Sequence, residues 1–189
     1  GRGVRRDYVE AAKWYRKAAD QGKANSQFNL GYMYVTGEGV PKDDVEAVRW
    51  YRKAAVQGDA AGQINLGWKY TEGKGVPKDE AEGVKWYRKA AEQGDAAGQA
   101  KLGGEYYYGR GVRKNYSKAV SWWRKAAEQG YADGQNNLGM MYDNGKGVRK
   151  NYVEAYKWYN LAAAQGEETA KENIETIAGS MTAYQIAEA

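Results

Sequence analysis

Apolar residues recur along the chain at helical spacing, in short segments of two kinds separated by glycine-rich turns. Residues 24–36 are the first kind, and their spacing predicts an amphipathic helix. This helix should end at Gly37–Pro41, the sequence GEGVP, because glycine permits a left-handed cap and proline cannot continue a helix. The second kind runs from about residue 44 to 57, with an apolar stripe made by Ala47, Trp50, Tyr51 and Ala54.

This two-helix unit returns every 36 residues. Tryptophans fall at Trp14, Trp50, Trp86, Trp122 and Trp158, and leucines at Leu30, Leu66, Leu102 and Leu138. Such a period is typical of a stacked array without an internal domain boundary, so we predict an all-α fold, an α/α superhelical solenoid of antiparallel helix pairs. Its predicted units are a partial first repeat at 1–22, repeats at 23–58, 59–94, 95–130 and 131–166, and capping helices at 167–189. Good capping side chains for the second helices stand at Asp43, Asp79 and Asn115.

The composition is compatible with thin interfaces between repeats. Leu, Ile, Val and Phe together supply 23 of 189 residues, whereas Ala supplies 29, Tyr 17 and Trp 7. So few large aliphatic residues would suggest intrinsic disorder if the net charge were high, but 29 basic and 24 acidic residues leave only +5. A solenoid has no large central core, so small residues and aromatic rings can fill its interfaces.

Several chemical functions are excluded by the residues present. Without Cys or His the chain has no disulfide, no zinc site of Cys/His type and no Cys–His or Ser–His–Asp nucleophile. Asp133 and Asp143 are ten positions apart, too far for a carboxylate pair in acid–base catalysis. The Gly-x-Gly-Val loops follow helices and lack a Gly-Lys-Ser/Thr sequence, so they are turns rather than phosphate loops. No segment approaches the roughly 20 apolar residues of a membrane span. We expect no enzymatic activity, no metal or other cofactor, and no membrane insertion.

Two motifs resemble known repeat families. The sequence QxxLGxxY at 27–34, followed by AxxxYxxA at 47–54, resembles the tetratricopeptide signature. The 36-residue period, the Gly-x-Gly-Val loop and the box WYRKAA, with its variants WWRKAA and WYNLAA, resemble the Sel1-like repeat family. This resemblance implies a superhelix whose first helices line a concave face, and an adaptor or scaffold role, mostly in bacteria. Similar bacterial proteins are often exported, which favours an exported or periplasmic location for a soluble protein, but the sequence leaves the compartment open.

The two ends depart from the repeat. The chain opens on a loop and a second-type helix, which we interpret as a truncated or processed beginning, and Tyr8 and Trp14 should be poorly covered. Near the other end, residues 182–185 offer a capping-box start for a short last helix that contains Tyr184 and Ile186. Such an atypical cap indicates a genuine C-terminal boundary.

Comparison between the copies separates scaffold positions from candidate binding positions. Residues that recur in every copy, such as the tryptophans of the WYRKAA box, serve the stacking that every repeat shares. First-helix positions that differ between copies are not required for this shared stacking, and the resemblance places them on the concave face. The candidate partner-binding residues are Asn25, Phe28, Tyr32, Ile64, Trp68, Gly104, Tyr107, Tyr108, Asn136, Met140 and Asp143. Ala100 and Gly104 should leave a depression flanked by Tyr107 and Tyr108.

These residues favour a non-enzymatic module that binds a partner peptide or protein along the concave groove, with Tyr32, Trp68 and Tyr107 as anchors. For Phe28 and Ile64, packing against neighbouring helices is an equally good interpretation. The alternative function is binding of carbohydrate or cell-wall fragments, with sugar rings stacked on Trp68 and Tyr107.

A basic stripe on the second helices has a simpler interpretation than nucleic-acid binding. Pairs such as Arg16-Lys17 follow Lys13, and Glu10 precedes Lys13 by three residues, a pattern that stabilises exposed helices. Aromatic and basic residues are expected on opposite faces, which counts against a nucleic-acid partner. We expect a monomer or an end-to-end self-associated protein.

Overall fold

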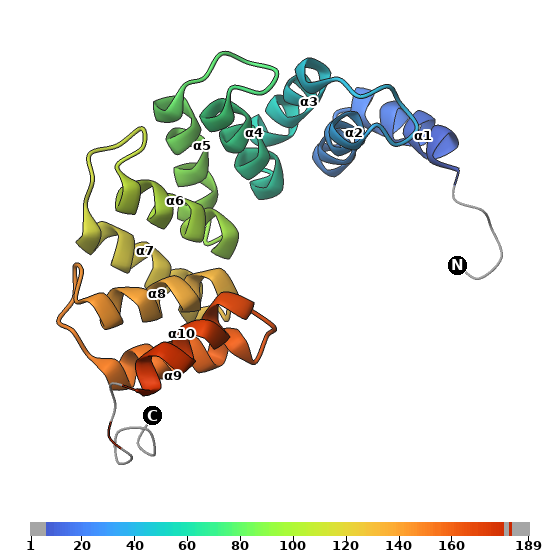
Figure 1. Ribbon diagram of the computed structural model, residues 1–189. Helices are drawn as coiled ribbons and strands as arrows, with labels where there is room; N and C mark the ends of the chain where they lie inside the picture. Colours follow the sequence, from blue (N-terminus) through green and yellow to red (C-terminus); the bar gives the residue numbers. More distant parts are fainter. Residues whose placement is uncertain (1–6, 180–181, 183–189) are drawn as a thin grey trace. The chain divides into compact units, whose positions relative to one another are not determined.

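The computed structural model describes residues 7–179 and Thr182, and this part of the chain forms helices joined by short turns, without strands (Figure 1). The helices are α1 Tyr8–Asp20, α2 Ala24–Thr36, α3 Asp44–Val56, α4 Ala60–Glu72, α5 Glu80–Glu92, α6 Ala96–Tyr108, α7 Tyr116–Glu128, α8 Ala132–Asn144, α9 Tyr152–Ala163 and α10 Glu168–Ala178. The even-numbered helices α2 to α8 are the first helices of the repeats, and the odd-numbered helices are the second helices. The predicted all-α solenoid with a 36-residue repeat is confirmed.

Residues 1–90 and 91–189 form two compact units, here called unit 1 and unit 2. Unit 1 contains α1 to α4 and most of α5, and unit 2 contains the end of α5 and α6 to α10. Within unit 1, α1 packs on α2, α2 on α3 and α3 on α4; within unit 2, each helix from α6 to α10 packs on the next. The single continuous array stays a prediction, and each unit is described by itself.

The helix ends follow the predicted chemistry. Asp43 accepts hydrogen bonds from the amides of Val45 and Glu46, at 2.9 and 3.0 Å, and so caps the N-terminus of α3. Asp79 and Asn115 accept the equivalent bonds at 2.9 Å and cap α5 and α7. At the other end of α2, Gly37 has a φ of +80°, a conformation that favours glycine. These caps turn each loop sharply enough to place two helices side by side.

Small residues let aromatic rings lie directly against a neighbouring helix. A Cβ atom at Gly31 would lie 2.8 Å from the ring of Tyr51, which is buried together with Ala47 and Leu66. The same arrangement recurs at Gly67 with Tyr87, in unit 1, and at Gly139 with Tyr159, in unit 2. Glycine in the first helix therefore makes room for the aromatic residue of the second helix, which explains the scarcity of large aliphatic residues.

A repeated glutamine also ties neighbouring helices together. Gln27 is 4% exposed, and its Nε2 donates to the carbonyl oxygen of Ala19 at 3.0 Å, while its Oε1 accepts from Nε2 of Gln57 at 2.6 Å. Gln99 and Gln135 make the equivalent pair of bonds in unit 2, where Gln129 and Gln165 are the donors. A buried amide is tolerated because its hydrogen bonds are satisfied, and sequence analysis did not anticipate this network.

The tryptophans of the WYRKAA box differ in exposure according to whether helices of a preceding repeat cover them. Trp50 is 5% exposed and packs in a cluster with Ala19 and Leu30, as expected for a structural residue. Trp14 is 61% exposed and Tyr8 38%, which confirms the predicted lack of cover at this end. Near the other end, α10 buries Ile177 against α9. The predicted last helix with Tyr184 and Ile186 lies outside the described residues, apart from Thr182 at its start.

The charged face of the second helices is solvated as predicted. Glu10 pairs with Lys13 at 3.3 Å and Glu82 with Lys85 at 2.8 Å, all on exposed or half-exposed side chains. Arg124 donates from Nη2 to the Tyr142 hydroxyl at 2.7 Å, so an arginine of the basic pair also bonds to the following first helix. These local bonds account for the recurring cations within the fold.

Candidate partner-binding surface

In unit 1 the candidate residues of α2 and α4 separate into exposed and packed side chains. Tyr32 is 50% exposed and Asn25 is exposed, with its Oδ1 accepting from Asn29 Nδ2 at 2.7 Å. Phe28 is half-buried: its ring centroid lies 5.8 Å from that of Tyr51, and it packs against the buried cluster around Leu66. Phe28 therefore serves the core, one of the two interpretations that the sequence allowed.

Trp68 and Ile64 on α4 are half-buried. The ring of Trp68 has two lysine ammonium groups near it, Lys74 at 4.7 Å and Lys69 at 5.2 Å from the ring centroid. Cations at this distance are attracted to the π-face of an indole. The accessible part of Trp68 is thus an aromatic surface next to positive charge.

In unit 2 the first helices carry a hollow at Gly104. A Cβ atom at this position would have no neighbouring atom within 4 Å. The hollow has a volume of about 190 Å³ and is lined by Ala100, Lys101, Gly104, Glu105, Tyr108, Arg110, Trp123, Asp133 and Asn137. Trp123 is held there because its Nε1 donates to the carbonyl oxygen of Ala100 at 3.0 Å. The structure thus brings together Ala100, Gly104 and Tyr108, around which the sequence predicted a depression.

Of the two neighbouring tyrosines predicted to flank this depression, Tyr108 lines the hollow and Tyr107 does not. Tyr108 is 64% exposed, whereas Tyr107 is half-buried among other rings. The Tyr107 ring centroid lies 4.9 Å from that of Tyr108, 5.3 Å from that of Tyr116 and 5.5 Å from that of Trp123. Tyr108 is therefore the accessible ring at the rim, and Tyr107 supports it from behind.

The remaining candidate residues lie on α8, and two of them make contacts within the fold. Met140 is half-buried and packs against the cluster formed by α9 and α10. Asn136 is half-buried, and its Oδ1 accepts from Nδ2 of Asn173 on α10 at 3.1 Å. Asp143 is half-buried, and together with burial it raises the pKa of the nearby Tyr159 hydroxyl, burial being the larger cause. Asn136 and Met140 are therefore held against the last helices of unit 2, and Asp143 lies near Tyr159 on α9.

One feature of the hollow was missed by sequence analysis. Glu105 is 4% exposed, and its carboxylate accepts two hydrogen bonds from Arg110, from Nε at 3.1 Å and from Nη2 at 3.0 Å. Such a two-point contact fixes the orientation of the Arg110 guanidinium group. The central carbon of this guanidinium group lies 5.0 Å from the ring centroid of Tyr108. The available signal was the repeat row itself, because Met33 and Met141 occupy the positions equivalent to Glu105. The same row also holds Lys69. A charged residue at a position that holds buried methionine in two other repeats marks a special contact.

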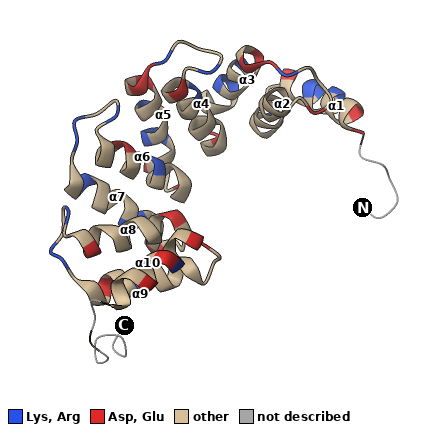
Figure 2. Ribbon diagram, in the orientation of Figure 1, with Lys and Arg blue, Asp and Glu red and all other residues tan. Residues whose placement is uncertain are grey.

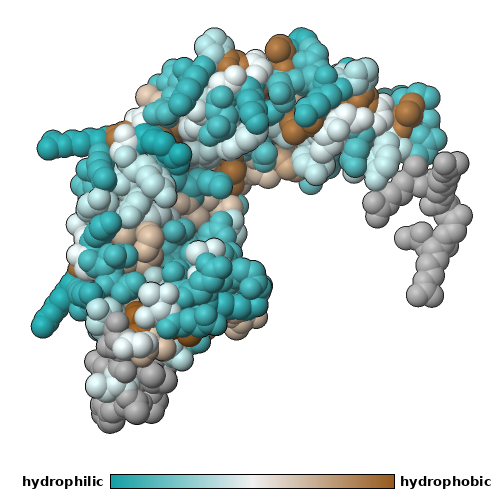
Figure 3. Space-filling model, in the orientation of Figure 1, coloured by the Kyte–Doolittle hydropathy of each residue, from teal (hydrophilic) through white to brown (hydrophobic). Residues whose placement is uncertain are grey.

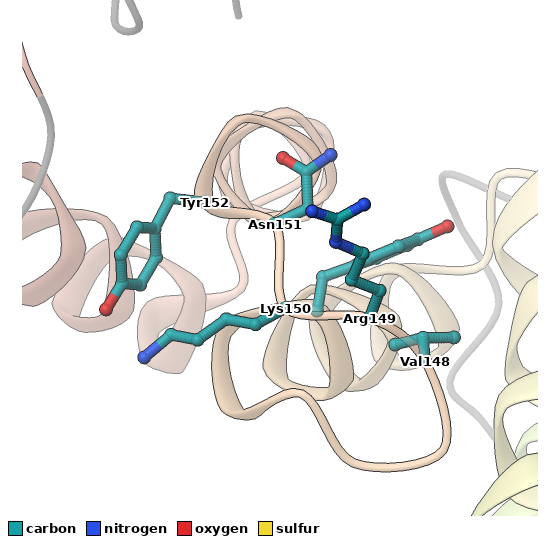
Figure 4. A pocket seen from close by; sticks show the side chains of 6 residues that line it. Val148, Arg149, Lys150, Asn151 and Tyr152 are labelled. Atoms are coloured by element: carbon teal, nitrogen blue, oxygen red, sulfur yellow. The ribbon is translucent and has the colours of Figure 1, made fainter.

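Two further hollows lie beside the loops of unit 2. One, of about 410 Å³, is lined by Tyr106, Val112, Arg113, Lys114, Asn115 and Lys118. The other, of about 740 Å³, is lined by Tyr142, Val148, Arg149, Lys150, Asn151 and Tyr152 (Figure 4). Five of the lining positions are equivalent in the repeat, 36 residues apart. A hydrogen bond to the Tyr116 hydroxyl raises the pKa of Lys114, and one to the Tyr152 hydroxyl raises the pKa of Lys150.

The described residues contain no cluster of three or more carboxylates that could hold a metal ion. Between residues 7 and 179, no helix combines the length and the apolar character of a membrane span. The candidate surface presents aromatic, cationic and hydrogen-bonding side chains.

Comparison with known proteins places this arrangement among related folds. A family model described as Sel1 repeat matches residues 1–23, 24–59, 60–95, 96–131 and 132–167. A protective antigen of uropathogenic Escherichia coli strains, which displays an SLR fold, is 39% identical with a TM-score of 0.89. That match covers 100% of this chain and 41% of the antigen. A Sel1 repeat protein from Oxalobacter formigenes is 42% identical with a TM-score of 0.87, over 93% of this chain and 71% of that protein.

One curated relative matches a short segment. The ERAD-associated E3 ubiquitin-protein ligase component HRD3B of Arabidopsis thaliana is 53% identical over 38 residues, which are 20% of this chain and 6% of the plant protein. This chain therefore spans less than half of the bacterial antigen and a small part of the plant protein.

Proposed function

Since five consecutive Sel1 repeats span residues 1–167, this chain belongs to the Sel1 repeat family, and we propose that it is a non-enzymatic module that binds a partner peptide or protein on its first helices. Sel1 repeat proteins are typically protein-interaction modules. The proposal extends to the exported, periplasmic location that the family resemblance implies.

The observation that carries the proposal is the hollow at Gly104. It combines an accessible ring, Tyr108, with an arginine that Glu105 holds in a fixed direction. Its volume of about 190 Å³ suits one apolar side chain rather than a whole small-molecule ligand. Anchor side chains of a partner typically enter pockets of this kind, surrounded by polar groups that orient the chain. In unit 1, the exposed Tyr32 supplies a second contact region of the same chemistry.

Carbohydrate binding is less well supported by the side chains involved. It requires a ring face free for stacking on a sugar, and the Tyr107 ring contacts three other aromatic rings. The Trp68 ring has two lysines beside it. Both tyrosine and tryptophan candidates for sugar stacking are thus engaged within the protein.

The test is a selection of peptides from a phage-displayed random library on the whole chain, followed by affinity measurements on the enriched peptides. Gly104→Trp fills the hollow with the residue that the equivalent position 68 already carries, so the helix should accept it. We expect this variant to weaken binding by about tenfold or more, and Gly104→Ala to leave it within about twofold.

Three results would contradict the proposal: no peptide is enriched, the enriched peptides bind Gly104→Trp as well as the wild type, or cell-wall glycan fragments saturate the intrinsic fluorescence at lower concentration than any peptide. Thermal unfolding of both variants is the control for folding.

A further inference from the structure

Equivalent loops of the two units differ in charge. In unit 2, residues 109–118 contain four cations, Arg110, Arg113, Lys114 and Lys118, and no carboxylate. Residues 145–154 contain three cations, Lys146, Arg149 and Lys150, and one carboxylate, Glu154. In unit 1 the equivalent residues 37–46 contain one cation and four carboxylates, and residues 73–82 contain two cations and three carboxylates. Among these four turns, the basic excess therefore lies in unit 2, where the loops after α6 and α8 carry Lys and Arg (Figure 2). The equivalent residues 1–10 contain three cations, Arg2, Arg5 and Arg6, and two carboxylates, Asp7 and Glu10.

The substitutions behind this difference fall at matched positions. Where unit 1 has Pro41 and Asp43, with Pro77 and Asp79 in its next loop, unit 2 has arginine and asparagine. The loop backbones are alike, because the amides of Asp43 and Asn115 donate to the carbonyl oxygens of Tyr34 and Tyr106 at 2.9 and 2.8 Å. Asparagine caps a helix as well as aspartate does but carries no charge. The difference thus changes the surface charge and leaves the turn intact.

The two basic loops form one continuous surface. Gly147 lies so close to the start of α7 that a Cβ atom there would be 2.6 Å from the carbonyl carbon of Tyr116. Nζ of Lys146 lies 3.4 Å from the Tyr107 hydroxyl, within hydrogen-bond reach, and 5.8 Å from the ring centroid of Tyr116. The second loop therefore rests on residues that flank the first. We call residues 109–118 and 145–154 together the basic edge, and Figure 3 shows hydrophilic side chains projecting from it.

The basic edge has recesses as well as charge. Each of its loops lines a hollow in which an arginine, a lysine and an asparagine follow one another, at 113–115 and 149–151. In Figure 4, Arg149 and Asn151 extend to the same side of the loop, and Lys150 is directed toward Tyr152. A pair of equivalent cationic recesses suits a ligand with repeated, separate negative groups.

The aromatic residues at this edge argue for carboxylates rather than for nucleobases or lipid. Base stacking needs free ring faces, but Tyr116 is half-buried, with Lys114 5.0 Å from its ring centroid and Tyr107 5.3 Å from it. Tyr152 is half-buried, with Lys150 at 4.5 Å. Membrane binding uses apolar side chains that enter the bilayer, and no large apolar side chain of residues 109–118 or 145–154 is exposed.

We propose that the basic edge of unit 2 is a docking surface for an acidic segment of a partner polypeptide. Side-chain carboxylates of that segment bind Arg113 and Lys114 in one recess, and Arg149 and Lys150 in the next. The inference rests on the proposed function in taking the partner to be a polypeptide. It concerns two recesses that share no lining residue with the Gly104 hollow, although Arg110 belongs both to the basic edge and to that hollow. Binding here is driven by charge, so it speeds association and weakens with salt.

The experiment exchanges the loop chemistry of the two units. The fourfold variant Arg113→Pro, Asn115→Asp, Arg149→Pro and Asn151→Asp gives unit 2 the residues that unit 1 has at the same positions. The matched control, Lys42→Glu with Lys78→Glu, lowers the net charge by the same four units but in unit 1. The probe is a fluorescein-labelled ten-residue peptide of alternating Glu and Ser, with a Gln–Ser peptide as the uncharged reference, measured by anisotropy.

We expect the wild type to bind the Glu–Ser peptide about tenfold or more tightly than the Gln–Ser peptide, with affinity falling as salt rises. The loop-exchange variant should lose about tenfold in affinity, and the control less than about twofold. A variant with Arg113, Lys114, Arg149 and Lys150 all changed to Gln keeps the backbone of both loops and should lose as much, which guards against misfolding of the proline variant. Gly104→Trp should leave this binding unchanged, which separates it from the proposed function.

The inference is overturned if the loop-exchange and Gln variants bind the peptide like the wild type, or if the unit 1 control loses as much as they do. It is also overturned if a ten-nucleotide single-stranded oligothymidylate, or vesicles containing phosphatidylserine, bind the basic edge more tightly than the acidic peptide.

Discussion

The ammonium group of Lys69 is buried at 1% exposure and forms an ion pair with the carboxylate of Asp44. Lys69 lies on α4, and Asp44 lies in the first turn of α3, within unit 1. The equivalent positions in other repeats hold Met33, 5% exposed, Met141, 0% exposed, and Glu105, 4% exposed. The site therefore accepts an unbranched apolar chain, and Lys69 fills it with its methylene stem while its charged end reaches Asp44.

Replacing Lys69 with methionine, the residue at equivalent positions 33 and 141, should be tolerated. Lys69→Met removes a buried charge and keeps the volume, and Asp44, whose side chain is 35% exposed, can regain water. Because desolvation offsets much of the attraction in a buried ion pair, we expect the free energy of unfolding to change by less than about 1 kcal/mol, or to rise. Urea denaturation measures this. A loss of several kcal/mol would show that the pair stabilises unit 1.

The opposite substitution should be costly. Asp44→Asn leaves the ammonium group of Lys69 buried without a carboxylate, which should lower the free energy of unfolding by about 2 kcal/mol or more. Asp43→Asn is the matched control in the same helix end, since it removes the same charge and keeps a good cap, and it should cost less than about 0.5 kcal/mol. Equal losses in the two variants would instead point to the helix dipole rather than to Lys69.

The same pair makes stability depend on acid. The hydrogen bond from Lys69 is the largest cause that lowers the pKa of Asp44, and it outweighs the opposing effect of burial. A carboxyl group whose pKa is lower in the folded state stabilises the fold above its unfolded pKa of about 3.9, and this contribution is lost as the pH falls through the folded pKa. We expect the melting temperature to fall below about pH 4, with a shallower fall in Lys69→Met. Identical acid profiles of the wild type and Lys69→Met would contradict this.

Two adjacent glycines on α6 provide a direct comparison of packing. A Cβ atom at Gly103 would lie 2.6 Å from Cδ1 and 2.7 Å from Nε1 of Trp123, whereas Gly104 has no atom within 4 Å of its Cβ position. Gly103→Ala should lower the free energy of unfolding by about 1–3 kcal/mol, because Trp123 must move from its bond to Ala100. Gly104→Ala should raise it by about 0.5–1 kcal/mol, since alanine favours the helix. Thermal or urea unfolding of both variants measures the change in the free energy of unfolding. Similar changes in the two variants would refute the packing difference.

The fold could be predicted from the sequence because the same local signals for helices and turns recur in every repeat. The spacing of Leu30 and Tyr34, the left-handed cap at Gly37 and the capping side chain of Asp43 each recur, so an error in one copy is corrected by the others. The buried glutamines were not anticipated, because a polar residue in a constant position gives no sign of where its hydrogen bonds go.

The candidate surface could be predicted only in part, because exposure depends on neighbours that the repeat does not specify. The open position at Gly104 followed from its contrast with Trp68 and Tyr32 in the same row. The sequence could not tell that Tyr107 turns toward Tyr116 while Tyr108 faces solvent, since both are next to each other on one helix. The expected separation of basic and aromatic residues was wrong: Lys53 lies 3.9 Å from the ring centroid of Trp50 on α3, and Lys114 lies over Tyr116 in unit 2.

Trp14 and Trp50 occupy the same position of the repeat but should contribute very differently to stability. Trp50 is 5% exposed and packs on Ala19 and Leu30. Its Nε1 has no hydrogen-bond partner among the described residues, so its contribution comes from packing. Trp50→Ala should therefore leave a cavity and lower the free energy of unfolding by about 3–5 kcal/mol.

Trp14→Ala should lower the free energy of unfolding by less than about 1 kcal/mol, because its side chain is 61% exposed and the ammonium group of Lys17 lies 5.1 Å from its ring centroid. Urea unfolding of both variants, followed by circular dichroism because tryptophan fluorescence is altered, gives the comparison. If Trp14→Ala proves as costly as Trp50→Ala at high protein concentration but not at low concentration, then Trp14 is covered by a second molecule, as the expected end-to-end self-association requires. A large loss in the free energy of unfolding at every protein concentration would mean that Trp14 is covered within unit 1 itself.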